Sequence, residues 1–394
     1  MSGRICFVVQ RYGLEINGGA EALCRMYAEK LASFYDVEVL TTKAVDYMSW
    51  KNEYEADKEE INDVTVLRFP VKKERGDEFH RLNSLFMQGK LPVCDEQKWI
   101  DEQGPLCPEL VSYLMEHEKE YKAIVFFTYL YYPTVMGIKA VSNRSILMPF
   151  AHDEPFLRMK IFDDVFLKPD AMVYSTDEER ELIGSRFRNE HIPYVIGGAG
   201  VDLPPSVDGE RFKKKYGIDN YIVYVGRIDE SKGCKELLNF FYDYKERNYT
   251  DISLVLMGKT VMDMSQYTGR GIINLGFVSD GDKFDGIAGA KALVLPSRFE
   301  SLSMVVLEAM SVETPVIVNG ACEVLKGHCL KSNGALYYSD YFEFEGELNY
   351  LLNPRNAGTV AAMKANAKRY VDENYQWDAI ISRVRGMIEK VGHC

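Results

Sequence analysis

The chain has few of the features that mark a membrane protein or a general nucleic-acid binder. None of its 394 residues belong to an uninterrupted run of the roughly 20 apolar residues that a membrane helix needs. The longest uncharged run, residues 123–138, is interrupted by Pro133 and Gly137. Acidic residues outnumber basic ones by 59 to 47, which gives a net charge of −12. Because nucleic-acid binders need basic surface to replace counterions, no nucleic-acid partner is expected.

The eight cysteines form no CxxC pair, so neither a zinc ribbon nor a disulfide framework is predicted. Cys322, His328 and Cys329 are the one cluster with metal-ligand chemistry, and their spacing is a weak zinc signal, so no metal is expected. The chain starts directly with an apolar strand, residues 5–9, without the layout of a signal peptide. Reduced thiols and a cytoplasmic location are therefore expected.

Two nucleotide-binding signatures are also missing. The glycine loop near residue 18 does not read GxGxxG, so the dinucleotide fingerprint is absent. No segment reads GxxxxGK[ST], which argues against a P-loop ATPase or a related kinase.

What the sequence does contain is a sustained alternation of short apolar runs and helical patterns. A chain of this length is too long for one core, so two domains are expected. The alternation predicts the α/β class, with a doubly wound parallel sheet in each Rossmann-like domain. The glycine run 197–200, followed by Pro204 and Pro205, is the clearest break in composition. It predicts domains at 1–198 and 199–375, with a final helix at 376–394 that packs back on the first domain.

In the first domain, strands are predicted at 5–9, 37–41, 64–69, 123–127, 145–148, 171–174 and 194–196, with helices at 20–33, 105–119 and 176–188. Residues 70–104 interrupt this rhythm with basic and apolar residues. Such a segment is a candidate for contact with an acceptor or, over 70–93, with an anionic membrane surface. The alternative is a solvated helix pair that covers the edge of the sheet.

In the second domain, strands are predicted at 221–225, 253–257, 272–275, 292–295, 315–318 and 335–337, and helices at 209–216 and 234–247. Long helices fill 340–393.

The stretch 297–310 has the pattern of a strand end followed by a helix. A buried run at 292–296 leads into it, and apolar residues then recur at helical spacing. Ser301 or Ser303 is predicted to cap the helix, whose first turn presents N–H groups to an anion. Glu300 and Glu308 add two carboxylates, so the stretch predicts a ligand with phosphate and hydroxyl groups, such as a nucleotide sugar. The alternative is an amphipathic helix with an ordinary acidic cap.

Other candidate residues follow the predicted strands. Arg227 and Lys232 flank the loop after 221–225 and suit the two negative groups of a diphosphate. Gly18 and Gly19 form a strand–turn–helix loop of the kind that approaches a phosphate, or merely a tight turn.

Further candidates end the strands 123–127 and 145–148 of the first domain. Tyr129, Tyr131 and Tyr132 follow one strand, and His152 and Asp153 follow the other. Ligands of open α/β sheets lie beyond the carboxyl ends of the strands, so these side chains are expected to converge on one crevice. A single histidine can also be structural.

Together these motifs resemble the retaining glycosyltransferases of family 4. The resemblance rests on Phe299-Glu300, then seven residues and Glu308-Ala309-Met310, followed by Thr314-Pro315. It also rests on Gly226-Arg227 with Lys232-Gly233, on Gly18-Gly19 with Ala20-Glu21, and on Gly200-Val201-Asp202. The motifs follow the family's order over nearly the whole chain.

The resemblance implies the GT-B fold, in which two Rossmann-like domains face each other across a cleft. The first domain would receive the acceptor, and the second would hold the nucleotide sugar. In the second domain, the resemblance implies that Arg227 and Lys232 contact the diphosphate and that Glu308 binds the ribose. Glu300 and the N–H groups of Ser301, Leu302 and Ser303 would bind the sugar. The nucleotide would lie along Gly226, Gly258 and residues 276–278, which include Val278. In the first domain, His152 would lie near the reacting centre, Gly18 and Gly19 would approach the distal phosphate, and Tyr129, Tyr132 and Asp153 are candidates for the acceptor.

The implied function is retaining, metal-independent transfer of a hexose-type sugar to a glycan, a lipid-linked or another hydroxyl acceptor, without a cofactor and in the synthesis of bacterial surface polysaccharide. The location would be cytoplasmic, with a peripheral site at the inner face of the membrane as an option. Ser301-Leu302-Ser303 and Asn319-Gly320 depart from the family's usual residues near the sugar, which leaves the sugar open. The alternatives are a sugar-nucleotide epimerase or phosphorylase of the same architecture, and a binding subunit without turnover.

Overall fold

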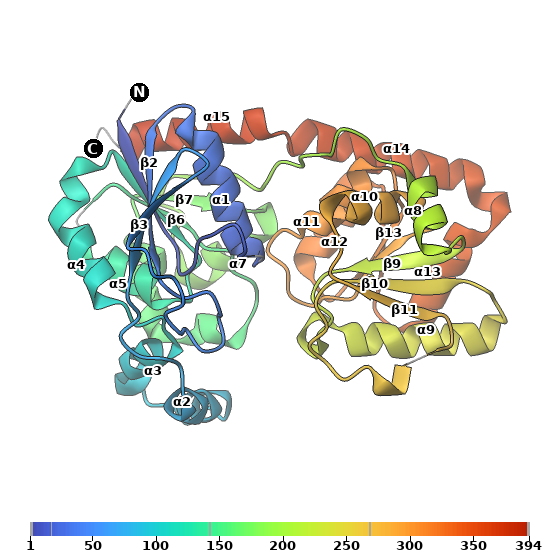
Figure 1. Ribbon diagram of the computed structural model, residues 1–394, viewed down its shortest axis with the longest axis horizontal. Helices are drawn as coiled ribbons and strands as arrows, with labels where there is room; N and C mark the ends of the chain where they lie inside the picture. Colours follow the sequence, from blue (N-terminus) through green and yellow to red (C-terminus); the bar gives the residue numbers. More distant parts are fainter. Residues whose placement is uncertain (1–2, 17, 142, 268, 392–394) are drawn as a thin grey trace. The chain divides into compact units, whose positions relative to one another are not determined.

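The structure is a computed structural model that describes residues 3–16, 18–141, 143–267 and 269–391. Its contacts divide the chain into two units (Figure 1). Unit 1 ends at Gly198 and takes in the chain again from Ile380, and unit 2 spans Ala199–Ala379. Among the described residues, no helix has both the length and the apolar character for crossing a bilayer.

Unit 1 is built on an eight-stranded sheet with the order β3-β4-β2-β1-β5-β6-β7-β8. Its strands are β1 (Arg4–Val8), β2 (Asp36–Thr42), β3 (Lys58–Ile61), β4 (Val64–Phe69), β5 (Ala123–Phe127), β6 (Ser145–Met148), β7 (Ala171–Tyr174) and β8 (Tyr194–Ile196). All neighbours are parallel except β3 and β4, which are antiparallel. The prediction of a purely parallel sheet missed β3, because this edge strand carries three charged residues and lacks an apolar run.

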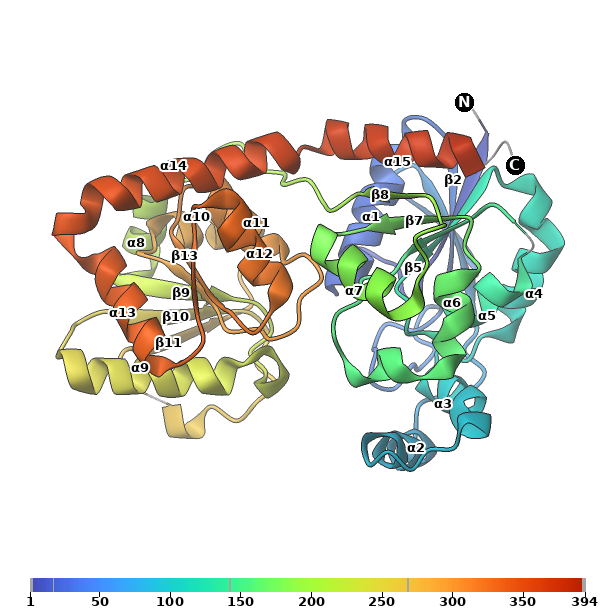
Figure 2. The same ribbon diagram turned by 180° about the vertical axis from the view of Figure 1, so that it is seen from behind.

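The helices of unit 1 are α1 (Gly19–Ala32), α2 (Asp77–Met87), α3 (Glu96–Gln103), α4 (Pro108–His117), α5 (Tyr132–Ala140), α6 (Asp163–Leu167), α7 (Asp177–Phe187) and α15 (Trp377–Val391). α1 lies on one face of the sheet, where Tyr27 packs on Phe127, and α4, α5 and α6 cover the other face (Figures 1 and 2). α15 packs on unit 1, as predicted, and Glu389 accepts a hydrogen bond from the Tyr35 hydroxyl at 2.8 Å.

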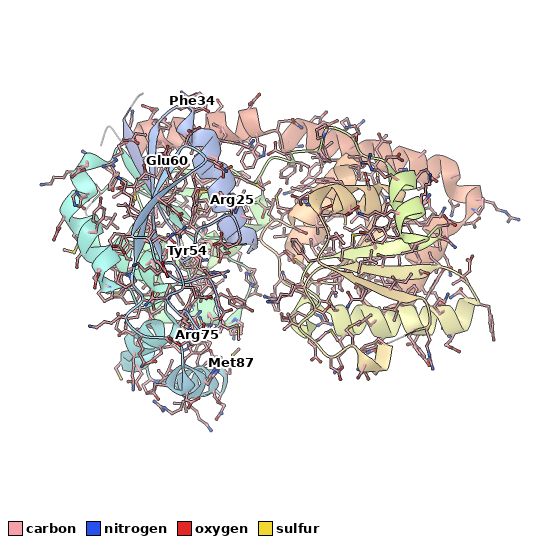
Figure 3. All side chains as sticks on the ribbon, in the orientation of Figure 1. Arg25, Phe34, Tyr54, Glu60, Arg75 and Met87 are labelled. Atoms are coloured by element: carbon pink, nitrogen blue, oxygen red, sulfur yellow. The ribbon has the colours of Figure 1, made fainter. Side chains whose placement is uncertain are left out.

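The segment 70–104 forms a helix pair, α2 and α3, whose aromatic side chains Phe79 and Phe86 pack on Trp99. It holds six Lys and Arg residues against seven Asp and Glu residues, so it is not a basic patch. Its cations are partly neutralised by ion pairs with carboxylates of the same segment, while Met87 stays exposed at the end of α2 (Figure 3). Membrane contact through 70–93 stays a prediction. The helix predicted from Pro105 starts later, with Pro108 in its first turn.

Unit 2 has a six-stranded, fully parallel sheet with the order β11-β10-β9-β12-β13-β14. The strands are β9 (Tyr221–Val225), β10 (Ser253–Met257), β11 (Ile272–Gly276), β12 (Leu293–Leu295), β13 (Val316–Asn319) and β14 (Leu336–Tyr338). The helices are α8 (Gly209–Tyr216), α9 (Cys234–Asn248), α10 (Asp280–Gly289), α11 (Met304–Ser311), α12 (Glu323–Ser332), α13 (Tyr341–Leu352) and α14 (Ala357–Asn374). The predicted strands of both units agree with these bounds to within two residues.

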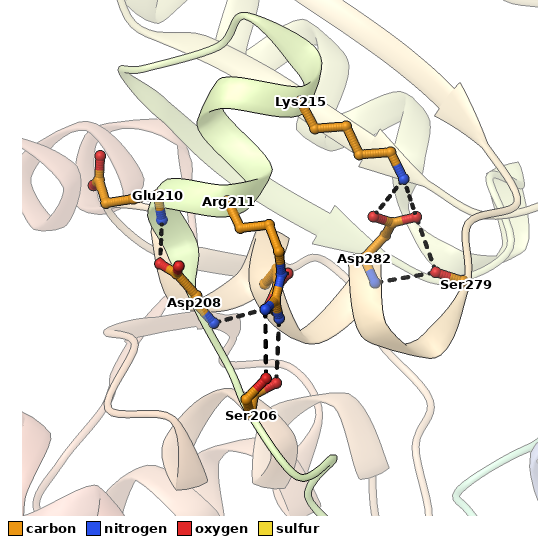
Figure 4. A network of polar contacts seen from close by, with 8 residues as sticks. Ser206, Asp208, Glu210, Arg211, Lys215, Ser279 and Asp282 are labelled. Carbon is orange, nitrogen blue, oxygen red and sulfur yellow. Dashed lines mark hydrogen bonds and ion pairs between the residues drawn. The ribbon is translucent and has the colours of Figure 1, made fainter.

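Helices cover both faces of this second sheet. α9 and α13 lie together on one face, where Phe240 packs on Phe344, and α8, α10 and α11 lie on the other (Figure 1). Ion pairs join α8 to α10: Arg211 binds the buried Asp285 with 2.7 Å between Nη2 and Oδ1, and Lys215 binds Asp282 at 2.8 Å (Figure 4). These contacts fix α10, the helix that carries Lys283.

Candidate functional site

The carboxyl edge of the unit 2 sheet is lined by glycines that let neighbouring loops approach closely. Gly226 follows β9 and Gly258 follows β10, with φ angles of 149° and 146°. A Cβ atom added to Gly258 would lie 2.0 Å from the Gly226 carbonyl oxygen. Only glycine satisfies both requirements, so the two predicted loops meet at this edge.

Arg227 follows Gly226 directly and forms an ion pair with Asp229, with 3.0 Å between Nε and Oδ2. Asp229 also accepts a hydrogen bond from the Ser231 N–H at 2.8 Å. Burial alone would raise the pKa of the Asp229 carboxyl group. The hydrogen bonds from Ser231 and the charge of Arg227 have the larger combined effect, so the pKa of Asp229 lies below its ordinary value. The carboxylate stays charged and holds the guanidinium in place.

Lys232 ends the same loop and binds the carboxylate of Glu300, with 2.8 Å between Nζ and Oε1. The next residue, Gly233, lies against the loop after β12, because a Cβ atom there would come 2.4 Å from the Pro296 carbonyl oxygen. The Arg227–Lys232 loop and the Glu300 loop are therefore direct neighbours. Both side chains keep solvent-accessible surface, 34% for Lys232 and 17% for Glu300, so a ligand can reach the pair.

The predicted capping of the next helix is wrong. α11 begins at Met304, and Ser303 before it has a left-handed backbone with φ 67° and no side-chain capping bond. In this conformation the hydroxyl does not reach the helix N–H groups. Among the described residues the buried Ser303 Oγ has no hydrogen-bond partner. The first turn of α11 still presents backbone N–H groups, as the sequence predicted.

Glu308 lies one turn into α11 and binds Lys283 of α10, with 2.9 Å between Oε1 and Nζ. Burial lowers the pKa of Lys283, but the charge and hydrogen bond of Glu308 exceed that effect, so the net pKa is raised. Lys283 is a residue that sequence reasoning missed. It stands on a helix whose acidic start, Asp280 and Asp282, indicates only a helix N-terminus.

Unit 1 presents a second group of candidate residues after β5 and β6. His152 lies with Nε2 3.7 Å from an oxygen of Glu154, and the other Glu154 oxygen accepts a hydrogen bond from the Tyr129 hydroxyl. The sequence predicted that Asp153 lies at this site, but Asp153 is exposed, and Glu154 is the carboxylate beside His152. The alternation of side chains along the loop, which the sequence does not reveal, turns Glu154 inward.

The structure does not support Tyr129 and Tyr132 as contacts for an acceptor. Both belong to the core cluster and are 2% and 7% exposed. Tyr129 packs edge-on against Phe162. Its place in the site is indirect, through Glu154.

A buried carboxylate anchors the loop that carries His152. Glu179 of α7 accepts hydrogen bonds from the N–H groups of Ala151 and Ser175, both at 2.6 Å. Burial raises the pKa of Glu179 to about 8, against the lowering effect of these donors. Phe150, two residues before His152, has a φ of 50°, and such strain is common where a loop serves a site.

Gly18 and Gly19 start α1 as predicted. Gly18 is held close to Glu21, whose carboxylate forms a buried ion pair with Arg11 at 2.6 Å. Around Gly19 there is open space, because an added Cβ atom would meet nothing within 4 Å. Packing therefore does not require glycine at 19.

The structure thus gathers Arg227, Lys232 and Glu300 at one sheet edge of unit 2, beside Gly226 and Gly258. Lys283 with Glu308 lies on the neighbouring helices. Gly18, Gly19 and His152 stand on unit 1. Val278 follows β11, on the loop whose Phe277 is 75% exposed. Among the described residues, no group of three potential ligands could hold a metal ion.

Chemically, the unit 2 edge combines fixed cations, helix N–H groups and carboxylates. Cations and N–H groups stabilise negative charge on phosphate oxygens, and carboxylates accept hydrogen bonds from hydroxyl groups.

Comparison with known proteins agrees with this chemistry. Residues 208–383 match the family described as glycosyl transferases group 1. Over 198 residues the chain is 29% identical to an uncharacterized glycosyltransferase of Methanocaldococcus jannaschii, covering 43% of this chain and 45% of that protein. Over 180 residues it is 26% identical to the capsular polysaccharide biosynthesis glycosyltransferase CapM of Staphylococcus aureus, covering 41% and 47%. The aligned part thus spans less than half of each of these relatives.

Solved structures match along nearly the whole chain. Sucrose-phosphate synthase from Thermosynechococcus elongatus has a TM-score of 0.74 at 15% identity, over 98% of both chains. Anabaena HepE in complex with UDP-glucose has a TM-score of 0.71 at 15% identity, over 98% of this chain and 99% of that one. At such identities the likeness concerns the fold. The chain therefore has the GT-B fold of glycosyltransferases, and its residues 208–383 match the group 1 family.

Proposed function

We propose that the protein is a glycosyltransferase that takes its sugar from a nucleoside-diphosphate sugar. The observation that carries the proposal is the contact between the Arg227–Lys232 loop and Glu300, beside the start of α11. These groups offer cations to a diphosphate and a carboxylate to sugar hydroxyls. The UDP-glucose complex of the structurally similar HepE supports a donor of this class.

In the proposed reaction, the bond between the sugar and the diphosphate breaks. Positive charge then develops at the anomeric carbon, and negative charge grows on the leaving diphosphate. Arg227, Lys232 and the N–H groups at the start of α11 would stabilise that negative charge without reorganising. Before the donor binds, ion pairs with Asp229 and Glu300 hold the two cations at this edge, and the cations would exchange these partners for the diphosphate on binding, ahead of the chemical step.

The finer parts of the proposal are a hexose-type donor, retention of the anomeric configuration, and a reaction without metal or cofactor. Retention would follow from attack on the front face of the sugar, assisted by the leaving phosphate, as the resemblance to family 4 implies. We also propose a glycan, lipid-linked or other hydroxyl acceptor in surface polysaccharide synthesis, which the similarity to CapM supports. Nuclear magnetic resonance of the product's anomeric proton distinguishes retention from inversion.

The test of the nucleotide site is calorimetry with UDP, GDP and dTDP. Binding of one of them is expected, and binding of none of them would refute the proposal. Arg227→Ala should then lower turnover about 10²–10³-fold, the typical loss of one preorganised charge-stabilising donor.

Arg247→Ala is the matched control for this variant. Arg247 lies at the opposite end of α9, about 20 Å from its start, and it also forms an ion pair, at 3.0 Å with Glu345. Both variants lose a partly exposed ion pair, so only Arg227→Ala should affect turnover.

A further inference from the structure

A chain of buried hydrogen bonds lies beneath the loop formed by residues 300–303. His328 of α12 contacts the Leu302 carbonyl oxygen through Nε2 at 2.7 Å and the Tyr370 hydroxyl through Nδ1 at 3.0 Å. The Tyr370 hydroxyl lies 3.0 Å from the Tyr375 hydroxyl. His328 is 2% exposed, and both tyrosines are buried. Both ring nitrogens of His328, the histidine of the weak zinc cluster, are therefore engaged in hydrogen bonds.

The chemistry of the groups gives this chain a direction. The Leu302 carbonyl can only accept, so Nε2 of His328 donates to it. In the neutral imidazole Nδ1 then accepts, which makes Tyr370 the donor to His328. The Tyr370 oxygen is left to accept from the Tyr375 hydroxyl. The Leu302 carbonyl group therefore fixes which group donates and which accepts in every hydrogen bond of this series.

The far end of the chain reaches the two segments that lead out of unit 2. The Tyr375 carbonyl accepts a hydrogen bond from the Val201 N–H at 3.2 Å. Gly200 lies directly on Trp377, because an added Cβ atom would come 2.4 Å from the ring. Unit 2 begins at residue 199 and ends at residue 379, so residues 199–201 are its first residues and residues 375–377 lie just before its end.

The near end controls the direction of an N–H group in the proposed donor site. The peptide between Leu302 and Ser303 is planar and trans, so its N–H points away from its carbonyl oxygen. Since His328 holds that oxygen from below, the Ser303 N–H points to the opposite side. Ser303 also has a strained φ of 67°, which persists only where the surroundings impose it.

We propose that His328, Tyr370 and Tyr375 form a positioning relay that sets the conformation of the 300–303 loop according to the position of residues 199–201 and 375–377. The inference rests on the proposed function in assigning the loop to the donor site. The relay itself is a property of the nucleotide-free protein. It can therefore be tested separately from activity.

The test is hydrogen–deuterium exchange over residues 299–306 in the nucleotide-free protein, followed by kinetics with the donor that the nucleotide screen identifies. Tyr375→Phe removes only the distal hydroxyl and leaves the His328 contact with Leu302 in place. We expect faster exchange in this loop and a kcat about fivefold lower, the effect of one buried hydrogen bond. Tyr244→Phe is the control, because it removes a partly buried hydrogen bond of 2.8 Å from a buried tyrosine to Asn349, between α9 and α13.

Two variants of His328 separate its contacts. The Gln side chain places its amide nitrogen near the position of Nε2, so His328→Gln keeps the Leu302 bond and loses the relay. Asn places its amide near Nδ1, so His328→Asn keeps the Tyr370 bond and loses Leu302. Both variants should speed hydrogen–deuterium exchange over residues 299–306, and the increase should be larger for His328→Asn than for His328→Gln.

The relay is overturned if Tyr375→Phe and His328→Gln leave loop exchange and kcat at the level of Tyr244→Phe. His328 would then be a local anchor for Leu302 alone. If the wild-type protein binds no nucleotide, the proposed function fails, but the exchange data still decide whether the distal hydroxyl controls the loop. Should Tyr375→Phe not fold, Tyr370→Phe provides the same comparison from the middle of the chain.

Discussion

Ser303→Gly should stabilise the protein and at the same time weaken donor binding. Ser303 has a φ of 67°, which lies in the region that costs a non-glycine residue about 1 kcal/mol. Among the described residues its buried hydroxyl also has no hydrogen-bond partner, which costs roughly 1–3 kcal/mol more. Glycine removes both penalties.

Part of this gain is offset because glycine has more freedom in the unfolded chain, by about 0.5–1 kcal/mol. The expected net change in unfolding free energy is therefore roughly +1 to +3.5 kcal/mol. Thermal denaturation measures the stability, and calorimetry with the nucleotide that the screen identifies measures binding. We expect affinity to fall about fivefold, as for the loss of one hydrogen bond, because the more flexible glycine no longer holds the N–H of residue 303 toward the ligand.

Two further variants divide these effects. Ser303→Ala removes the hydroxyl but keeps the strained backbone and the direction of the N–H group, so it should keep the affinity of the wild type and gain less stability. Asn333→Gly is the control for strain alone, because Asn333 ends α12 with a φ of 47°. A Ser303→Gly protein that is no more stable than wild type, or that binds nucleotide equally well, would refute this reasoning.

Three other predictions concern unit 1 and the pH dependence of unit 2. Gly19→Ala should slightly stabilise α1 yet lower turnover if a ligand approaches the open space there. Gly358→Ala, near the start of α14 with similar open space, is the control and should stabilise its helix without affecting turnover. Equal turnover in both variants would contradict a ligand role for Gly19. Glu154→Gln removes the charge 3.7 Å from His152, so kcat should fall while the melting temperature changes little, and an unchanged kcat would exclude a role for this pair in turnover. Burial and the charge of Glu343 raise the pKa of Glu347 to about 8, so the stability that protonated Glu347 contributes is present below about pH 4.5 and is lost as the pH rises through 8. The melting temperature of Glu347→Gln should therefore rise relative to that of the wild type between pH 5 and pH 9. A difference that stays constant with pH would contradict the raised pKa.

The strands and the glycine loops could be predicted from the sequence because their signals are local. A buried parallel strand is a short apolar run, and Gly258 at φ 146° is a residue that no other side chain can replace without a clash. β3 escaped prediction because it lies at the edge and carries polar residues on both faces. Its pairing with β4 depends on tertiary context.

The partners of the site residues could not be predicted, because each comes from a distant part of the chain. Lys283 meets Glu308 across 25 positions, and His328 meets Leu302 across 26. Nothing in the local pattern around Lys283 or His328 distinguishes them from any surface lysine or core histidine. The capping error at Ser303 has another cause, since a serine before a helix predicts a cap only when its backbone is extended.

The charges of the unit 2 edge bear on how the proposed nucleotide-sugar donor would be selected. Arg227, Lys232 and Lys283 each face a carboxylate, from Asp229, Glu300 and Glu308. These three pairs of opposite charges cancel, so the attraction of an anion cannot come from their net field and depends on exchange of partners.

A ligand with phosphates alone would take the cations and leave the carboxylates without partners, which is costly for partly buried groups. A ligand that also carries hydroxyl groups would satisfy the released carboxylates by donating hydrogen bonds to them. Calorimetry should therefore show that inorganic pyrophosphate binds at least about tenfold more weakly than the nucleotide sugar, a difference of roughly 1.4 kcal/mol. Equal affinities would mean that Glu300 and Glu308 keep their lysines when the ligand binds, and that the hydroxyl groups of the sugar and ribose are recognised elsewhere.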